Sequence, residues 1–243
     1  MKHIFSFALL AAFIIASCKS KTSSTDKNTD NAVADSLVNK INILGSYVGA
    51  FGDNKINVLI TRIAGDSIEG NSIVAGNART FKGTINKKDS VISISAKEPG
   101  DDKNDGSFQF AINASNPNTL TGSWQPYKST ENVGDKKFSL VKRTFSYKAD
   151  VGEYPQASMK LLSDSDVNNM DKYELEMMRN EIFARHGYCF TRRETRQEFE
   201  SEDWYIPASV DVRKDITEIE RKNITLIKKY EKYAKEYGDD YGR

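Results

Sequence analysis

Apolar and polar residues alternate over much of the first half of the chain. Apolar side chains recur at every second position from Ile56 to Ile60, and the same pattern returns from Phe108 to Ile112. This alternation is typical of β-strands with one buried face. Similar segments, each bounded by Gly, Asn, Asp or Pro, run over residues 45–51, 67–74, 79–86, 90–96, 120–127 and 136–147. The pattern predicts about eight strands between residues 43 and 148.

Short polar connections separate these segments and predict hairpins. Asp53-Asn54 and Gly65-Asp66 carry turn residues, as do residues 87–89 and 115–118. Strands joined by such loops pair antiparallel and form a meander. Glycine also recurs at Gly45, Gly70, Gly83 and Gly122. Because strand glycines commonly mark bends, we expect the meander to coil into a small barrel, with a sandwich as the alternative.

The apolar spacing becomes helical after Tyr154-Pro155. Asp171 and Glu174 form a capping-box pattern at the start of a helix that Gly187 ends. The apolar stripe of this helix consists of Leu175, Met178, Ile182 and Phe183.

Two more helices are predicted, over residues 192–200 and 216–237. The second is capped either by Asp215 with Glu218 or by Thr217 with Glu220. The whole chain is therefore predicted to be an α+β protein. Its antiparallel β domain covers residues 43–148, a small helical domain covers residues 155–237, and a tail follows at 238–243.

A series of motifs in the helical half resembles a known domain family. Residues 179–188 read RNEIFARHGY, and Phe199, Trp204-Tyr205 and Ile219-Glu220 with Asn223 and Ile227 follow in order. Together, over roughly residues 160–233, they resemble the YARHG domain. The resemblance implies an extracellular or envelope compartment in bacteria and carries no established activity. Phe183 stands where the family has the tyrosine that names the motif, so ring packing explains this position better than a catalytic hydroxyl.

The motif residues allow two interpretations. In the first they are structural: Arg179, Asn180 and Arg185 bind carboxylates and backbone carbonyls near a helix end, Asn223 satisfies a buried polar group, and Trp204-Tyr205 holds an irregular segment on the core. In the second, a binding groove for glycan or muropeptide is formed by Arg185, His186, Trp204 and Tyr205.

The first 18 residues predict where the protein resides. Lys2 and His3 precede an apolar run from Ile4 to Ile15, and Ala16-Ser17-Cys18 follows. A run of about a dozen residues is shorter than the roughly 20 that cross a bilayer. The segment resembles a bacterial lipoprotein signal, which implies a signal peptide at 1–17 and acylation of Cys18.

The polar stretch at 18–42, beginning with the lipidated cysteine, is predicted to be a disordered tether. We expect a lipid-anchored envelope protein at the outer membrane that faces the periplasm, since Lys19-Ser20-Lys21 rather than acidic residues follow the cysteine.

Composition limits the chemistry further. Loss of Lys2 with the signal leaves 34 basic residues against 34 acidic ones, so nucleic acid is not an expected partner. With Cys18 acylated, Cys189 is the last thiol, and it is predicted to be a buried small hydrophobe rather than part of a disulfide. His186 is the single histidine left after the signal, so any Ser-His-Asp chemistry has to use it. No cofactor is predicted.

The segment from Glu98 to Gly106 is rich in acidic residues. A solvated hairpin turn is the favoured interpretation, because Pro99-Gly100 and Asp105-Gly106 are turn-forming pairs. A calcium site is the alternative, with candidate ligands Glu98, Asp101, Asp102 and Asp105. An EF-hand register that starts at Asp101 places Lys103 at a ligand position, which disfavours that motif.

These features predict a non-enzymatic envelope lipoprotein. Its anchor is the lipid on Cys18, and its YARHG-like domain is expected to bind cell-wall glycan or a partner envelope protein. The alternatives are a small-ligand carrier that uses the barrel interior and a cell-wall hydrolase that acts through His186.

Overall fold

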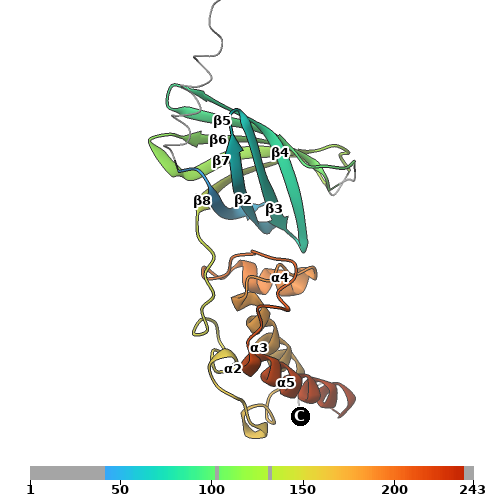
Figure 1. The fold of residues 1–243 in the computed structure, drawn as a ribbon. Helices are drawn as coiled ribbons and strands as arrows, with labels where there is room; N and C mark the ends of the chain where they lie inside the picture. The colour runs from blue at the N-terminus through green and yellow to red at the C-terminus, as the bar shows by residue number, and fades with distance from the viewer. Residues whose placement is uncertain (1–41, 102–103, 131–132, 238–243) are drawn as a thin grey trace, which may run out of the picture.

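The computed structural model describes residues 42–101, 104–130 and 133–237. Its first part is a closed barrel of eight strands (Figure 1), so the predicted α+β class is confirmed, and so is the barrel that was favoured over a sandwich. The strands are β1 (Gly45–Phe51), β2 (Asn54–Ala64), β3 (Ser67–Val74), β4 (Asn77–Lys88), β5 (Val91–Lys97), β6 (Gly106–Asn113), β7 (Asn116–Pro126) and β8 (Lys136–Lys142). The predicted signal peptide, Cys18, the tether up to residue 41 and the tail at 238–243 lie outside the described residues.

Consecutive strands pair antiparallel, as the short connections predict. The barrel closes because β1 pairs with β8, through Tyr47 opposite Lys142 and Val48 opposite Val141. Closure leaves neither of these two strands as an open sheet edge.

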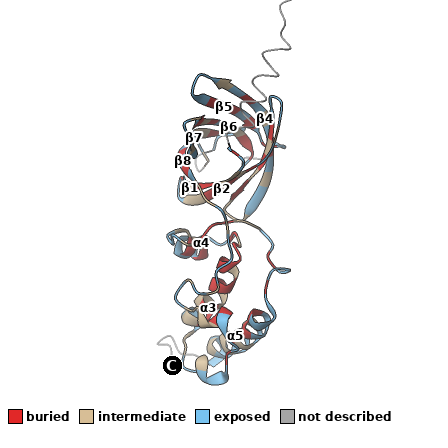
Figure 2. Cartoon of the chain, turned by 60° about the vertical axis from the view of Figure 1, so that its left-hand side comes forward, coloured by how far each residue is buried: buried red, intermediate tan, exposed pale blue. Residues whose placement is uncertain are grey.

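The alternating apolar residues face the barrel interior. In β5, Ile92, Ile94 and Ala96 are buried while their neighbours are exposed. An aromatic cluster of Phe81, Phe108, Phe110 and Phe138 fills the centre, with ring centroids 5.0–6.2 Å apart. Figure 2 shows this buried face along the inside of the strands.

Glycine is required where strands approach closely. A Cβ at Gly83 would lie 2.0 Å from the Ser95 carbonyl oxygen, and one at Gly70 would lie 2.3 Å from the Leu59 oxygen. The absence of a side chain thus lets the coiled strands come together at these positions.

Two predicted strand limits are wrong. The strand predicted to reach Tyr147 ends at Lys142, because Phe145 and Tyr147 pack on the helical region instead of the barrel. The predicted turn at 115–118 is shorter, and β7 begins at Asn116 with Pro117 as its second residue. A proline is compatible with the start of a strand, where its missing N–H costs little.

The helical region contains α2 (Gln156–Met159), the 3₁₀ helix η1 (Asp164–Asp166), α3 (Lys172–Arg185), α4 (Arg193–Glu200) and α5 (Glu218–Tyr237). The longer helices α3 and α5 pack on each other around Leu175, Met178, Ile182 and Ile227. Reciprocal hydrogen bonds between Thr217 and Glu220 begin α5, which decides between the two predicted capping pairs. Within the described residues, no helix has both the length and the apolar character needed to cross a membrane.

Candidate functional site

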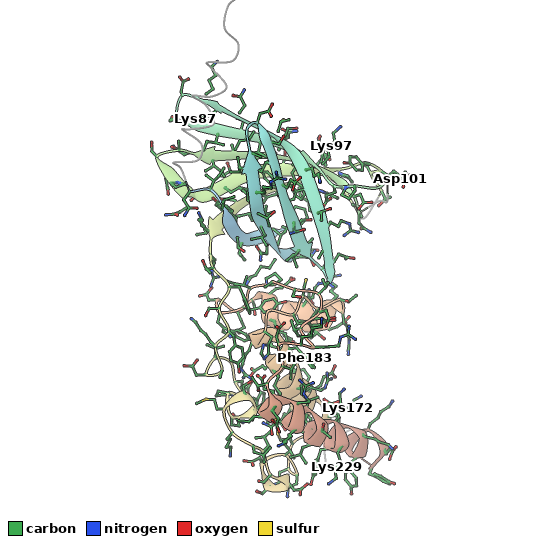
Figure 3. The ribbon with its side chains drawn as sticks, in the orientation of Figure 1. Lys87, Lys97, Asp101, Lys172, Phe183 and Lys229 are labelled. Carbon is green, nitrogen blue, oxygen red and sulfur yellow. The ribbon has the colours of Figure 1, made fainter. Side chains whose placement is uncertain are left out.

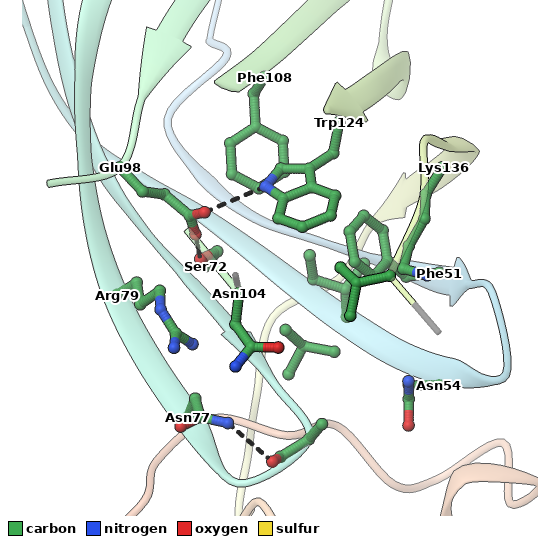
Figure 4. A pocket seen from close by; sticks show the side chains of 14 residues that line it. Phe51, Asn54, Ser72, Asn77, Arg79, Glu98, Asn104, Phe108, Trp124 and Lys136 are labelled. Atoms are coloured by element: carbon green, nitrogen blue, oxygen red, sulfur yellow. Dashed lines mark hydrogen bonds between the residues drawn. The ribbon is translucent and has the colours of Figure 1, made fainter. Parts of the chain in front are cut away.

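A cavity of about 260 Å³ opens at the barrel end that carries the β1–β2 and β3–β4 turns (Figure 4). Its apolar wall is formed by Phe51, Ile56, Val74, Phe108, Trp124 and Val133. Its charged side chains are those of Arg79, Glu98 and Lys136. A concave apolar site with a few convergent polar groups is the usual form of a small-molecule site.

Glu98 directs a carboxylate into this cavity. It follows β5 directly, and the inward positions of Ile92, Ile94 and Ala96 continue to Glu98 two residues further on. Its exposure is only 5%, so the fold has placed an acidic group in an apolar interior. Such a group requires hydrogen-bond partners.

Three donors hold the Glu98 carboxylate. The Ser72 hydroxyl donates to Oε1 at 2.6 Å, and the Trp124 indole N–H and the Gly106 backbone N–H each donate to Oε2 at 3.0 Å. Burial raises the pKa of Glu98, while these hydrogen bonds and the charge of Arg79 act in the opposite direction. The carboxylate is thus fixed in position inside the cavity wall.

Arg79 reaches the same cavity from β4. Its Nε donates to Asp105 Oδ1 at 2.7 Å, and the guanidinium points into the cavity in Figure 4. Lys136 lies at the rim with its Nζ 5.6 Å from the centroid of the Phe51 ring. Opposite charges from different strands therefore meet in one apolar space.

The described acidic residues of the 98–105 segment do not converge on a calcium site. Glu98 faces inward and Asp105 pairs with Arg79, whereas Asp101 is 94% exposed, extends away from the barrel (Figure 3) and pairs with Lys128. Asp102 lies outside the described residues. No group of three or more His, Cys, Asp and Glu side chains suited to a metal ion occurs in the described ranges.

In the helical region, backbone capping sets the start of α3. The Asp171 carboxylate accepts the Glu174 N–H at 2.9 Å, and the Glu174 carboxylate accepts the Asp171 N–H at 2.8 Å. This is the predicted capping box, which satisfies two N–H groups that a helix start leaves free.

The end of α3 is a Schellman motif built by the FARHG residues. The Gly187 N–H donates to Ala184 O at 2.9 Å and the Tyr188 N–H donates to Phe183 O at 3.0 Å. Gly187 has φ +73°, a conformation that glycine adopts without steric cost. The Phe183 and Tyr188 rings lie 6.2 Å apart, as the apolar contact of this motif requires, so Phe183 packs there.

Arg185 is buried in a charged network directly before this turn. It donates to Glu181 Oε2, to Val151 O at 2.8 Å and to the Ser158 hydroxyl at 3.1 Å. Glu181 in turn accepts the backbone N–H groups of Glu153 and Tyr154. Arg185 is only 2% exposed. Its hydrogen bonds to Val151 and Ser158 tie α3 to the segment that leads into the helical region.

Glu220 of α5 collects the remaining polar contacts. His186 Nε2 lies 2.7 Å from its Oε2, and Ser158 and Tyr147 donate to its Oε1 at 2.7 and 3.0 Å. Burial alone would raise the pKa of Glu220, but hydrogen bonds from His186, Ser158 and the Thr217 backbone lower it to about 2. The His186 ring stacks on Tyr147 with centroids 4.4 Å apart.

Each residue of the FARHG run, residues 183–187, therefore makes its contacts at the C-terminal end of α3. Residues 152–232 match the YARHG domain family. The match confirms the resemblance and covers the C-terminal part of the chain. Comparison of the chain with curated proteins and with solved structures gives no match.

In the YARHG domain, the four residues predicted to share a groove occupy two separate buried clusters. Arg185 and His186 belong to the charged network, whereas Tyr205 is fully buried against Phe190 and Phe199 and donates its hydroxyl to Tyr188 O at 2.7 Å. Trp204 is half-buried beside Phe199. The predicted groove from these four residues is therefore not formed.

Other motif residues have the predicted structural partners. Asn223 is fully buried, accepts the Leu162 N–H at 2.9 Å and donates to the carbonyls of Ala157 and Lys160. Arg179 donates to Glu231 at 2.6 Å and to Asn180 Oδ1 at 3.0 Å.

A wider groove of about 600 Å³ does lie on the YARHG domain, between α3, α4 and residues 210–213. It is bordered by the motif residues Arg179, Asn180 and Phe183, together with Arg192 and Arg213. Each of the three guanidiniums is paired with a carboxylate, of Glu231, Glu176 and Asp211 respectively.

The YARHG domain also contacts the rim of the barrel. The Gly76 N–H in the β3–β4 turn donates to Cys189 Sγ at 3.1 Å, and Asn57 donates to Pro207 O at 2.9 Å. Lys55 donates to Glu202 O at 2.8 Å. Cys189 is buried as predicted, and burial raises its pKa to about 11.

Sequence reasoning missed Arg79 as a cavity residue and assigned Glu98 to a turn. The alternation of inward and outward positions along β4 and β5 does indicate that both side chains face the barrel interior. Glu98 has the same parity as Ile92 and Ile94, and Arg79 has the same parity as Phe81 and Ile85. A charged residue at an inward position of a strand is the pattern that could have identified both.

Proposed function

We propose that this protein is a non-enzymatic lipoprotein of the bacterial cell envelope that binds a small ligand in the mouth of its barrel. The observation that supports this most strongly is the cavity itself, since Glu98 and Arg79 enter an apolar space of about 260 Å³. Ligand pockets in proteins commonly have about 300–1,000 Å³, so a small ligand fits this site best.

The proposed location comes from the N-terminal sequence. The apolar run before Cys18 resembles a lipoprotein signal, and the polar tether that follows would hold the folded part near the membrane. The YARHG domain agrees with an envelope location, because the resemblance implies such a compartment.

The ligand site can be tested by filling it. Val74→Trp puts an indole into the cavity, and Thr80→Trp is the matched control on the exposed face of β4. The full-length protein and both variants are purified from bacterial membranes in mild detergent, and native mass spectrometry detects bound small molecules. A screen of small metabolites by thermal shift accompanies it.

We expect a bound compound or a stabilising metabolite with the wild type and Thr80→Trp, and neither with Val74→Trp. If Val74→Trp keeps the bound compound as well as the wild type does, the ligand does not bind in the barrel mouth. So does the absence of any bound or stabilising compound in both experiments.

The YARHG groove supports a second candidate, binding to peptidoglycan. Arg179, Arg192 and Arg213 line this groove together with Phe183 and Tyr188, and such groups can hold carboxylates and sugar faces. The test is co-sedimentation of the full chain with purified sacculi. The double variant Arg192→Ala with Arg213→Ala should stay in solution, while Lys222→Ala on exposed α5 should pellet like the wild type. Pelleting of the double variant argues against this groove.

A further inference from the structure

The two charges of the barrel mouth indicate which class of ligand it accepts. This inference rests on the proposed function, because it concerns the same cavity. Glu98 is more deeply buried, at 5% exposure, while the side chain of Arg79 is 22% exposed and Lys136 lies at the rim. The deepest charge in the cavity is thus the Glu98 carboxylate, and nearer the opening lie Arg79, which is paired with Asp105, and Lys136.

Glu98 retains the capacity to accept one further hydrogen bond. An ionised carboxylate offers about four acceptor positions. Ser72 uses one position on Oε1, while Trp124 and Gly106 use two on Oε2. The remaining position is on Oε1, so a donor from a ligand can bind to this oxygen.

Arg79 offers the complementary group. A guanidinium has five N–H donors, and among the hydrogen bonds of the described residues Arg79 uses only its Nε, toward Asp105. Its two terminal nitrogens point into the cavity (Figure 4). Paired N–H groups of this kind match a carboxylate in a bidentate manner.

A ligand with one charge satisfies only half of this arrangement. A cation would meet Glu98 but repel Arg79, and an anion would meet Arg79 but repel Glu98, in a space where apolar walls weaken screening. Arg79 and Glu98 come from the paired strands β4 and β5, near Lys82 and Lys97 that lie opposite each other, and both line the same cavity, so the two charges are close enough for both effects. A molecule with an ammonium and a carboxylate on adjacent atoms presents the opposite sign to each.

The apolar wall sets the rest of the ligand. Phe51, Phe108 and Trp124 supply aromatic surface beside the charged pair. The volume of about 260 Å³ corresponds to about nine water molecules at about 30 Å³ each, and covalently bonded atoms pack more closely than water. A single amino acid with an aromatic or branched side chain fits this space.

We propose that the barrel mouth binds a small zwitterion of the α-amino acid class, with the ammonium on Glu98, the carboxylate on Arg79 and an apolar side chain against Phe51, Phe108 and Trp124. The ammonium enters first, because the acidic group lies deeper than the basic one.

Isothermal titration of the full-length protein in detergent tests this class with three matched probes. Phenylalanine carries both charges, 2-phenylethylamine carries only the ammonium, and 3-phenylpropionate carries only the carboxylate. We expect phenylalanine to bind at least roughly tenfold more tightly than either single-charge probe, a difference of about 1.4 kcal/mol.

Variants assign the two contacts. Glu98→Gln should reduce phenylalanine affinity to about that of 3-phenylpropionate, and Arg79→Gln should reduce it to about that of 2-phenylethylamine. Glu69→Gln, on the outer surface of β3, should leave the affinity unchanged. If Glu98→Gln does not fold, the affinities of the three probes for the wild type, together with the effect of Arg79→Gln, still test the ligand class.

The proposal is overturned if a single-charge probe binds as tightly as phenylalanine or if none of the three binds. Tight binding of one charged probe that Val74→Trp abolishes would leave the barrel-mouth site in place and refute only the ligand class. A ligand found by native mass spectrometry that is not a zwitterion would do the same.

Discussion

The same residue type serves different purposes in the two parts of this chain, according to its surroundings. Glu98 and Glu220 are both buried carboxylates. For Glu98 burial has the larger effect and raises the pKa. For Glu220 the hydrogen bonds from His186, Ser158 and the Thr217 backbone outweigh burial, and its pKa falls to about 2. Glu220 therefore stabilises the fold as an anion.

This difference predicts an acid-sensitive component of stability. A carboxyl group with a lowered folded-state pKa stabilises the protein above its usual pKa near 4.5, and the contribution is lost as the pH falls toward 2. At pH 7 it amounts to at most about 3 kcal/mol. Glu220→Gln should lower the free energy of unfolding at pH 7 by about 1–3 kcal/mol.

Urea unfolding at pH 7 and at pH 2.5 measures this effect. The difference between the wild type and Glu220→Gln should shrink at the lower pH, because pH 2.5 lies well below the usual pKa near 4.5, so the carboxyl of the unfolded wild type is protonated there and ionising it on folding offsets the gain. Glu218→Gln, two residues away on the exposed face of α5, should change little at either pH. An equal difference at both values would show that Glu220 does not contribute through its charge.

At the scale of elements, local patterns account for most of what forms. Alternation predicted the inward face of β5, and the capping box predicted where α3 begins. The end of α3 depends on Gly187, whose positive φ completes the Schellman motif. Tertiary packing adds a second requirement there, since a Cβ on Gly187 would lie 2.8 Å from both Ala208 Cβ and Phe145 Cε2.

Gly187→Ala should therefore lower the free energy of unfolding by more than the strain of a positive-φ alanine alone would. We expect a loss of about 2–4 kcal/mol in the free energy of unfolding, which combines the positive-φ penalty with overpacking. Gly65→Ala is the matched control, because Gly65 also has positive φ but nothing within 4 Å of its Cβ position. That variant should lose about 1 kcal/mol. Equal losses in urea unfolding would refute the packing argument.

At the scale of the whole molecule, the barrel and the YARHG domain are joined along the cavity rim. The β3–β4 turn borders the cavity through Ala75 and Asn77, and its Gly76 contacts Cys189 and Thr191 of the YARHG domain. The raised pKa of Cys189, about 11, keeps the thiol protonated at neutral pH. Because Cys189 is buried against Gly76, the rate at which a thiol reagent modifies Cys189 measures whether the contact between the β3–β4 turn and the YARHG domain is intact.

Gly76→Ala should separate the turn from the YARHG domain, because the new Cβ would lie 2.5 Å from Thr191 Oγ1 and 2.7 Å from Thr191 Cα. In a Cys18→Ser background, where Cys189 is the single thiol, we expect Ellman's reagent to modify the variant at least roughly tenfold faster than the parent. Gly65→Ala in the β2–β3 turn should react like the parent. Unchanged reactivity of Gly76→Ala would show that this contact does not protect Cys189.

The sequence alone determined the features that depend on neighbours in the chain. These are the strand faces, the helix caps, the glycine end of α3 and the motif that identifies the YARHG domain. Each is encoded within a few residues, because strand and helix periods and capping bonds are local.

Only the tertiary structure decided features that join distant residues. Barrel closure pairs Tyr47 with Lys142, which no local pattern specifies. The sequence predicts Arg185 and His186 as possible ligand-binding residues, but in the fold their side chains bind Ser158 and Glu220, which come from other elements. Pairing of the consecutive strands β4 and β5 places Arg79 and Glu98 at the same end of the sheet, but only barrel closure encloses their charges in one apolar space, because Phe51 and Trp124 come from distant strands.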